Sequence, residues 1–171
     1  NMSFIRSTCD RVAVLDTGVR GNHPDLAGKL LPGYHMVSDT RISNDGNGRD
    51  SDPSDPGDWL TQAEINANTT FWDGCAESDS SWHGTQVSGI VAAATGNGVG
   101  MAGSGRHVRV LPVRVAGKCG AAVADIVDGM RWAAGLPVEG VPLNPNPARI
   151  INISFGGSAV CTAAYQDAVN E

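Results

Sequence analysis

Aromatic residues make up only 5% of this 171-residue chain, and its 12 lysine and arginine residues are outnumbered by 18 aspartate and glutamate residues. The resulting net charge of −6 gives no support to a nucleic-acid partner, because nucleic-acid binders carry basic surfaces. No apolar run approaches the roughly 20 residues that a membrane span needs. No signal peptide opens the chain, so a secreted protein would already have lost it. The sequence therefore predicts no nucleic-acid partner and no membrane partner.

The remaining composition is typical of one globular α/β domain. Hydrophobic residues reach 41%, glycine is abundant at 22 residues, and this length suffices to bury a core. Residues 1–10 form an N-terminal segment whose role the sequence does not indicate, and residues 11–171 form the domain. Acidic residues are concentrated between positions 39 and 79, which indicates a bound cation rather than a macromolecular partner.

Two segments carry the clearest chemistry. Residues 12–15 read as a short buried strand that ends in the turn Asp16-Thr17-Gly18, and His83 opens a run of small residues. A histidine is a common general base, and it needs a carboxylate to orient it. Asp16 is the better candidate because its strand fixes it, although Asp73 and Asp79 are nearer in sequence. The run after the histidine predicts a buried helix from four apolar residues at helical spacing, Val87, Ile90, Val91 and Ala94.

Asp16-Thr17-Gly18 followed by His83-Gly84-Thr85 resembles the subtilisin family of serine proteases, whose triad runs Asp, His, Ser along the chain. The resemblance implies an α/β fold with a doubly wound, mostly parallel sheet, of which this chain is the N-terminal portion. It implies that Asp16 and His83 are catalytic. The family's Gly-Thr-Ser-Met-Ala nucleophile motif has no counterpart here. The resemblance therefore implies that the serine lies on a missing C-terminal part of the same protease, as a second chain.

The resemblance also implies the two edges of a cleft that binds protein or peptide substrates. One edge follows the strand predicted over residues 108–115, and the other is Asn152-Ile153-Ser154-Phe155-Gly156-Gly157, which is similar to the family's Asn-x-Ser-Leu-Gly-Gly. An unpaired edge of this kind recruits an extended peptide as an added strand. The implied substrate-binding residues are Gly117, Cys119, Gly120, Ser154, Phe155 and Gly156.

One or two calcium sites are expected. The His23-Pro24-Asp25-Leu26 stretch and the glycine-rich loop at residues 95–103 resemble the family's calcium site, which implies as ligands Asp25, Thr95, Asn97, Val99 and Met101. A second acidic loop offers hard oxygens at five positions, Asp45, Asn47, Asp50, Asp52 and Asp55. Closely spaced carboxylates repel one another, which favours a cation there, and a solvated acidic loop is the alternative.

Four cysteines are more than a cytosolic protease needs. In a subtilisin-like fold the loops that carry Cys75 and Cys119 border the same cleft, so the resemblance predicts a Cys75–Cys119 disulfide. Cys9 and Cys161 have no obvious partner, and Cys161 can pair with a cysteine outside this chain. Four free buried thiols are the alternative. A disulfide favours a secreted, extracellular protein.

The functional expectation is a secreted, calcium-stabilised serine endopeptidase. Its alternative is a catalytically inactive fragment that binds peptide or calcium. Outside the motifs, the sequence predicts a strand over residues 34–37 and helices over residues 124–134 and 163–171. It predicts a polar loop over residues 62–81, and Trp132 beneath the sheet.

Overall fold

The computed structural model describes residues 11–157 and 161–171. Its centre is a sheet whose strands run parallel in the order β2-β3-β1-β4. The strands are β1 (Arg11–Asp16), β2 (Tyr34–His35), β3 (Arg109–Arg114) and β4 (Ile150–Ile153). The strand predicted over residues 34–37 is thus confirmed in a shorter form.

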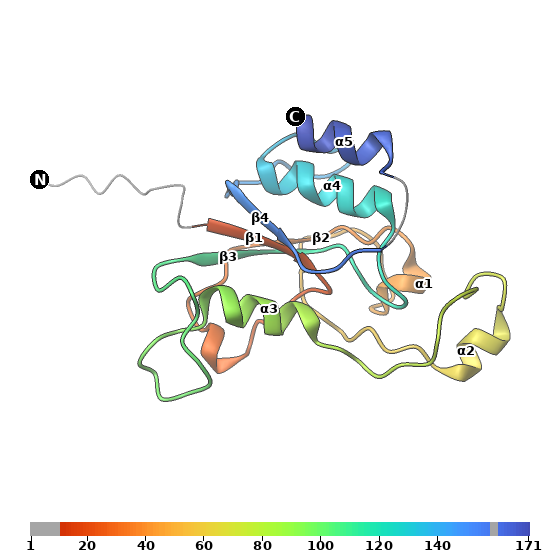
Figure 1. Cartoon of the computed structure of the whole chain (residues 1–171), viewed down its shortest axis with the longest axis horizontal. Helices are drawn as coiled ribbons and strands as arrows, with labels where there is room; N and C mark the ends of the chain where they lie inside the picture. Colours follow the sequence, from red (N-terminus) through yellow and green to blue (C-terminus); the bar gives the residue numbers. More distant parts are fainter. Residues whose placement is uncertain (1–10, 158–160) are drawn as a thin grey trace, which may run out of the picture.

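Helices cover both faces of this sheet (Figure 1). One face packs against α3 (His83–Ala92), and the other packs against α4 (Val123–Ala134), which in turn contacts α5 (Ala163–Asn170). The short helices η2 (Pro24–Leu26), α1 (Thr40–Ser43) and α2 (Gln62–Ala67) lie in the connections. The doubly wound α/β fold predicted from the sequence is confirmed. Within the described residues, no helix is both long enough and apolar enough to cross a bilayer.

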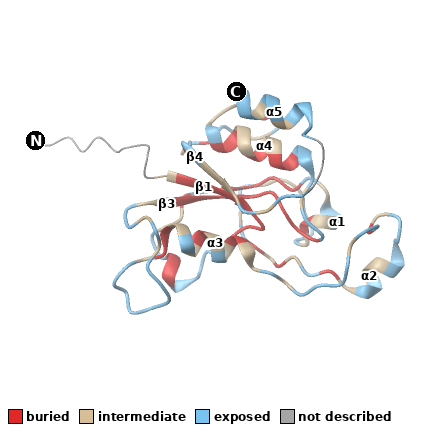
Figure 2. Cartoon of the chain, in the orientation of Figure 1, coloured by how far each residue is buried: buried red, intermediate tan, exposed pale blue. Residues whose placement is uncertain are grey.

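Successive side chains of β1 point to opposite faces of the sheet, and both faces are buried, so its sequence is one apolar run. Val12 and Val14 join Ala92 of α3 in one buried cluster, and Ala13 and Leu15 join the cluster on the α4 side. A strand buried on both faces carries apolar side chains at every position. Figure 2 shows the resulting burial of β1 and β3 at the centre of the fold. Asp16, at the end of β1, therefore sits on a rigid support.

The interval between β2 and α3 contains structure that the sequence analysis missed. Residues 62–81 are predicted as a polar loop, but they begin with α2, and Thr61 and Glu64 form a capping box at its start. The Thr-x-x-Glu spacing is a helix-start signal that could have been found in the sequence. No residue of α2 is buried, so the apolar periodicity that normally reveals a helix is absent.

Two predicted helix faces differ from the observed ones. On α3 the buried residues are Gly84, Ser88 and Ala92, and Ile90 is 58% exposed. Four-residue spacing of small residues lets the helix backbone approach the sheet closely, and this turns Ile90 away from it. On α4 the apolar spacing of Ile126, Val127, Met130 and Ala134 in the sequence predicts one buried face, but Ala134 is exposed and the buried face runs through Ile126, Gly129 and Trp132. The prediction that Trp132 packs beneath the sheet is confirmed.

Candidate active site

Asp16 and His83 meet at the carboxyl end of β1. Asp16 is 1% exposed and closes the strand, while His83 is the first residue of α3. His83 Nδ1 lies 2.8 Å from Asp16 Oδ1 and 3.0 Å from Oδ2. The structure therefore brings together two side chains that are 67 residues apart in the sequence. Because Nδ1 faces the carboxylate, Nε2 is the ring nitrogen available for proton transfer.

The turn before α3 is held by hydrogen bonds from the preceding loop. Trp82 adopts a left-handed conformation with φ of 52°. The N–H of His83 donates to Ser81 Oγ at 3.2 Å. Ser81 in turn donates its N–H and hydroxyl to Asp58 at 2.6 and 2.8 Å. Asp58 therefore anchors the turn from which His83 projects.

Gly84 allows α3 to dock directly on the turn after β1. A Cβ atom at this position would collide with the carbonyl oxygen of Gly18 and would press on the Asp16 side chain. Only glycine lacks that atom, so the approach of the helix to the turn depends on it. This packing sets the separation between His83 and Asp16.

A cleft of about 830 Å³ opens above this pair. Its floor includes Asp16 and His83, and apolar side chains including Ile126 and Tyr165 line it. Five of the six predicted substrate-binding residues line the cleft, namely Gly117, Cys119, Gly120, Phe155 and Gly156. The sixth, Ser154, is exposed outside the lining, and its hydroxyl accepts from the Asn152 amide at 2.7 Å.

The predicted Cys75–Cys119 disulfide is confirmed. It joins the loop before α3 to the segment Gly117–Gly120 that lines the cleft, with the two Cα atoms 5.8 Å apart. Cys161 is exposed and outside any disulfide of the described residues, and Cys9 lies outside those residues. The alternative of four free buried thiols is therefore wrong.

A buried lysine, which sequence reasoning missed, makes a second connection at the same place. Lys118 is 6% exposed and pairs with Glu64 of α2. The Lys118 ammonium, followed by the Thr61 hydroxyl, lowers the pKa of Glu64 from 4.5 to about 2. Lys118 Nζ also lies 5.5 Å from the centre of the Trp59 ring. The segment 57–81 is thus joined to the cleft edge by the Lys118–Glu64 ion pair as well as by the Cys75–Cys119 disulfide.

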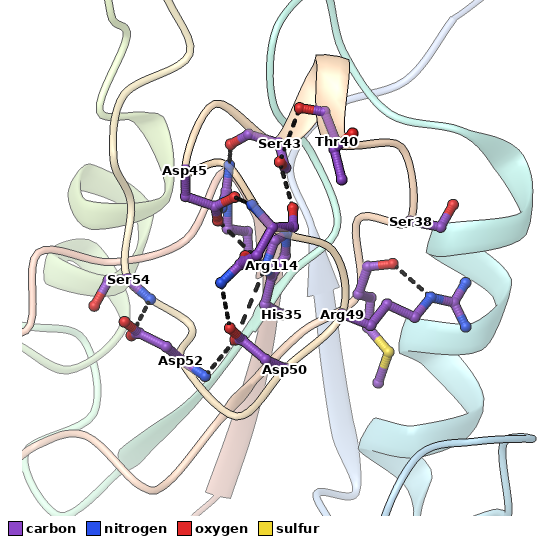
Figure 3. A network of polar contacts seen from close by, with 12 residues as sticks. His35, Ser38, Thr40, Ser43, Asp45, Arg49, Asp50, Asp52, Ser54 and Arg114 are labelled. Atoms are coloured by element: carbon purple, nitrogen blue, oxygen red, sulfur yellow. Dashed lines mark hydrogen bonds and ion pairs between the residues drawn. The ribbon is translucent and has the colours of Figure 1, made fainter.

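The acidic loop is built around a buried arginine (Figure 3). Arg114, which is 1% exposed, pairs with Asp45 and donates to the Ser43 carbonyl. His35 Nδ1 lies 3.3 Å from Asp45 Oδ2 and 3.9 Å from Asp50 Oδ1. Burial, and after it the charge of Arg114, lowers the pKa of His35. Arg114 therefore compensates the charge of one carboxylate of the loop, that of Asp45.

Four of the five predicted ligands of the acidic loop are linked by local hydrogen bonds, Asp45 to Asn47, Asn47 to Asp50 and Asp50 to Asp52, and Asp55 lies elsewhere. Asn47 donates its amide to Asp50 at 2.9 Å, and Asp52 accepts the N–H of Ser54 at 3.0 Å. Asp55 lies at the Asp16 turn instead, where it accepts the Thr17 hydroxyl at 2.7 Å. Burial raises the pKa of Asp55 above its usual value, although the Thr17 and Gly57 donors oppose the shift. Calcium binding by this loop stays a prediction.

The glycine-rich loop at residues 95–103, predicted as part of the Asp25 calcium site, wraps around one buried carboxylate. Asp25, 3% exposed, accepts the Met101 N–H at 2.9 Å and the Asn97 amide at 2.8 Å. These donors hold the pKa of Asp25 below its usual value. Asn97 Oδ1 accepts the N–H of Val99, and Thr95 is exposed. Across residues 11–157 and 161–171, no three His, Cys, Asp or Glu side chains gather as a metal-binding group.

Comparisons with known proteins relate this chain to one family. The model of the subtilase family matches residues 11–171. The chain is 47% identical over 159 residues to an extracellular protease of Xanthomonas campestris pv. campestris, a match that covers 93% of this chain and 26% of that protein. It is 44% identical over 161 residues to an extracellular basic protease of Dichelobacter nodosus, covering 94% of this chain and 26% of that protein.

A solved protease from Pseudoalteromonas arctica superposes with a TM-score of 0.83 at 49% identity. That match covers 94% of this chain and 45% of the solved chain. The chain thus spans about a quarter of the length of the two curated relatives.

Proposed function

Because the chain belongs to the subtilase family, we propose that it carries the Asp and His of a serine endopeptidase triad, Asp16 and His83. The observation that carries this proposal is the 2.8 Å contact between His83 Nδ1 and Asp16 at the floor of the cleft. The names of the relatives from Xanthomonas and Dichelobacter support a protease, and they support a secreted one.

The proposed reaction is acyl transfer from a peptide to a serine and then to water. His83 Nε2 takes the proton from the serine hydroxyl as its oxygen attacks the scissile carbonyl. The same nitrogen returns that proton to the leaving amine, and an acyl-enzyme remains. A water molecule, deprotonated by His83, then releases the acid product and restores the serine. Asp16 holds the imidazole with Nδ1–H toward its carboxylate and stabilises the imidazolium as it forms.

The proposed substrate is an extended protein or peptide segment that lies between the two edges of the cleft. Gly117, Cys119 and Gly120 offer backbone groups on one side, and Phe155 and Gly156 lie on the other. Backbone pairing of this kind binds many sequences, since the hydrogen-bonding groups are common to all peptides. Ser154 contributes backbone groups in this proposal although its side chain lies outside the lining.

The proposed partner is the remainder of the same protease, as a second chain that supplies the serine. β4 pairs with β1 alone among the described strands, and its residue Ile150 is 51% exposed. Ile90 of α3 is 58% exposed. Because apolar sheet edges tend to be covered, both features favour further chain packed against β4 and α3.

The deciding experiment is intact mass under denaturing conditions, with and without prior treatment by a fluorophosphonate serine probe. A second chain that gains the mass of the probe is the expected result. The matched control is His83→Ala in the complete protease, which should remove labelling. A single chain of this length that never labels would contradict the proposal and favour the inactive peptide-binding alternative.

We also propose one calcium site at Asp25. The ligands that the family resemblance implies are hard oxygens of the kind calcium prefers, namely the Asp25 carboxylate, the Asn97 side-chain oxygen and the carbonyls of Thr95, Val99 and Met101. The proposal requires the Asn97 amide to rotate so that its oxygen faces the ion. In the acidic loop, Arg114 already neutralises Asp45, so we do not extend the proposal there.

Thermal unfolding with calcium or with a chelator tests the Asp25 site. Calcium should raise the unfolding midpoint of the wild type, since a ligand at about 100 times its Kd adds about 2.7 kcal/mol to stability. Asp25→Asn should lose this increment, and the exposed Asp73→Asn should keep it. Equal calcium dependence in the wild type and Asp25→Asn would exclude the site.

A further inference from the structure

A second buried carboxylate lies behind the Asp16–His83 contact and is joined to it through one threonine. The Thr17 hydroxyl donates to Asp55 Oδ2 at 2.7 Å, and the N–H of Gly84 donates to Thr17 Oγ1 at 3.1 Å. The N–H of Thr17 donates to Asp16 Oδ1 at 2.8 Å. Thr17 therefore contacts the Asp16 carboxylate through its backbone and the start of α3 through its side chain.

This contact replaces a cap that α3 does not have. The first N–H groups of a helix lack partners within it, and the residue before the helix usually supplies a side-chain acceptor. Trp82 occupies that position and makes no such hydrogen bond. The Thr17 hydroxyl, which comes from a different segment, accepts from Gly84 instead. Together with Ser81, which accepts from the N–H of His83, the residue next to Asp16 therefore caps the helix that carries His83.

Asp55 is fixed tightly enough to hold Thr17 in one orientation. The N–H of Val19 donates to the Pro53 carbonyl at 3.1 Å, and the N–H of Asp55 donates to the Val19 carbonyl at 3.2 Å. Gly57 donates its N–H to Asp55 Oδ1 at 2.8 Å. The residue is 4% exposed. Because Asp55 accepts the hydroxyl proton of Thr17, a lone pair of that oxygen is left directed at Gly84.

From these contacts we infer that Thr17 and Asp55 are positioning residues for the Asp16–His83 pair. Thr17 sets the carboxylate and the helix start against each other, and Asp55 fixes the rotamer of Thr17. This inference rests on the proposed proteolytic function. A displacement of about 1 Å in a catalytic geometry costs about 10²-fold in rate, so the loss should fall on kcat.

The competing role for Asp55 is the calcium ligand expected from the sequence. The structure engages both of its carboxylate oxygens, one with Thr17 and the other with Gly57. The two roles differ in their response to calcium. A ligand substitution is sensitive to calcium concentration, and a positioning substitution is not.

Four variants of the complete protease separate these possibilities. Thr17→Val keeps the shape but removes the hydroxyl, and Thr17→Ser restores it. Asp55→Asn keeps one oxygen but sets its amide nitrogen against a Gly57 or Thr17 donor. Asp79→Asn is the matched control, because it removes the same charge from an exposed position close to His83 in sequence. Each is assayed for kcat and KM on a chromogenic peptide, with and without calcium, and for the proton resonance of His83 Nδ1–H.

Thr17→Val should lower kcat about 10-fold to 100-fold and leave KM within about twofold. It should also shift the His83 Nδ1–H resonance. Thr17→Ser should restore most of kcat, Asp55→Asn should fall between the two, and Asp79→Asn should match the wild type. If Thr17→Val does not fold, the test rests on Asp55→Asn, through its kcat and its His83 Nδ1–H resonance.

Three results would overturn the inference. The first is an unchanged kcat in both Thr17→Val and Asp55→Asn, and the second is a Thr17→Ser variant as slow as Thr17→Val. The third is a loss in Asp55→Asn that saturating calcium repairs. A wild type that neither labels nor hydrolyses peptide refutes the proposed function instead, and the His83 resonance then still tests the positioning role.

Discussion

The two walls of the cleft are built in opposite ways. The wall after β3 is fastened by the Cys75–Cys119 disulfide and by the Lys118–Glu64 ion pair. The wall after β4 belongs to the edge strand of the sheet, and Ser154, Gly156 and Gly157 on it are exposed. The first wall is held by contacts within the described residues. The second has one free side, where we propose that the rest of the protease packs.

This difference follows from the segment that supplies the disulfide and the ion pair. Both connections to the first wall start in the segment 57–81, which carries α2 and has little core of its own. That segment leads into the turn before His83, where Asp58 holds Ser81. A surface excursion, residues 57–81, thus joins one cleft wall to His83, while the other wall depends on the sheet alone.

The largest expected effect falls on the floor that the two walls share. Asp16→Asn in the complete protease should lower kcat about 10⁴-fold, because the amide no longer selects the tautomer with a proton on Nδ1. Steady-state hydrolysis of a chromogenic peptide measures this loss in kcat. Exposed Asp73→Asn is the control for loss of a charge. A loss below about tenfold would contradict a triad role for Asp16.

Removing the disulfide that holds the wall after β3 should have the next largest effect. Cys75→Ser with Cys119→Ser should lower the free energy of unfolding by about 2–4 kcal/mol. The disulfide joins residues that are 44 positions apart, so it restricts the unfolded chain substantially. The cleft edge should also loosen and raise KM. Denaturant unfolding and peptide kinetics measure the two effects, with exposed Cys161→Ser as the control. Unchanged KM would mean that the Lys118 contacts alone hold the edge.

Trimming the other wall should change binding more than stability. Phe155→Ala removes a half-buried ring from the cleft, so KM for an apolar peptide should rise about 3-fold to 10-fold, as the loss of part of a buried side chain predicts. The unfolding midpoint should move less than in the double cysteine variant. If it moves as far, the two walls are equally integrated into the fold and the contrast between them fails.

The smallest effect should come from the ion pair, and it should depend on pH. The pKa of Glu64 is lowered to about 2 by Lys118 and Thr61, so the charged pair stabilises the folded state above pH 4.5. That stabilisation is lost as the pH falls from 4.5 toward 2, because protons then enter the carboxylate. Unfolding midpoints of the wild type and Glu64→Gln should therefore converge over this range. Glu139→Gln, at an exposed position, should follow the wild type throughout.

The sequence was sufficient where local pattern and family resemblance agree. Asp16-Thr17-Gly18 and His83-Gly84-Thr85 predicted the fold, and the resemblance predicted the Cys75–Cys119 bridge; the family and the bridge are confirmed. The contact between Asp16 and His83 is observed, and its catalytic role stays a proposal.

The rest depended on contacts between distant residues. Asp55 was interpreted from its acidic neighbours, but a hydroxyl 38 residues away determines its environment. Arg114 lies in an apolar strand where nothing in the local pattern reveals that it meets Asp45. The exposure of Ile90 follows from which face of α3 carries small residues, and a count of apolar positions does not register that.

Gly84 and the segment upstream of it mark the two extremes of what this architecture tolerates during evolution. The chain leaves the Asp16 turn at Gly18 and returns to the same point at Gly84, and between them lies the surface excursion over residues 57–81. Doubling the length of a flexible loop costs only about 0.6 kcal/mol, so insertions there are inexpensive to accumulate. A single methyl group at Gly84, by contrast, meets the Gly18 carbonyl. New properties can therefore be acquired by lengthening the excursion, while its point of closure is confined to one residue type.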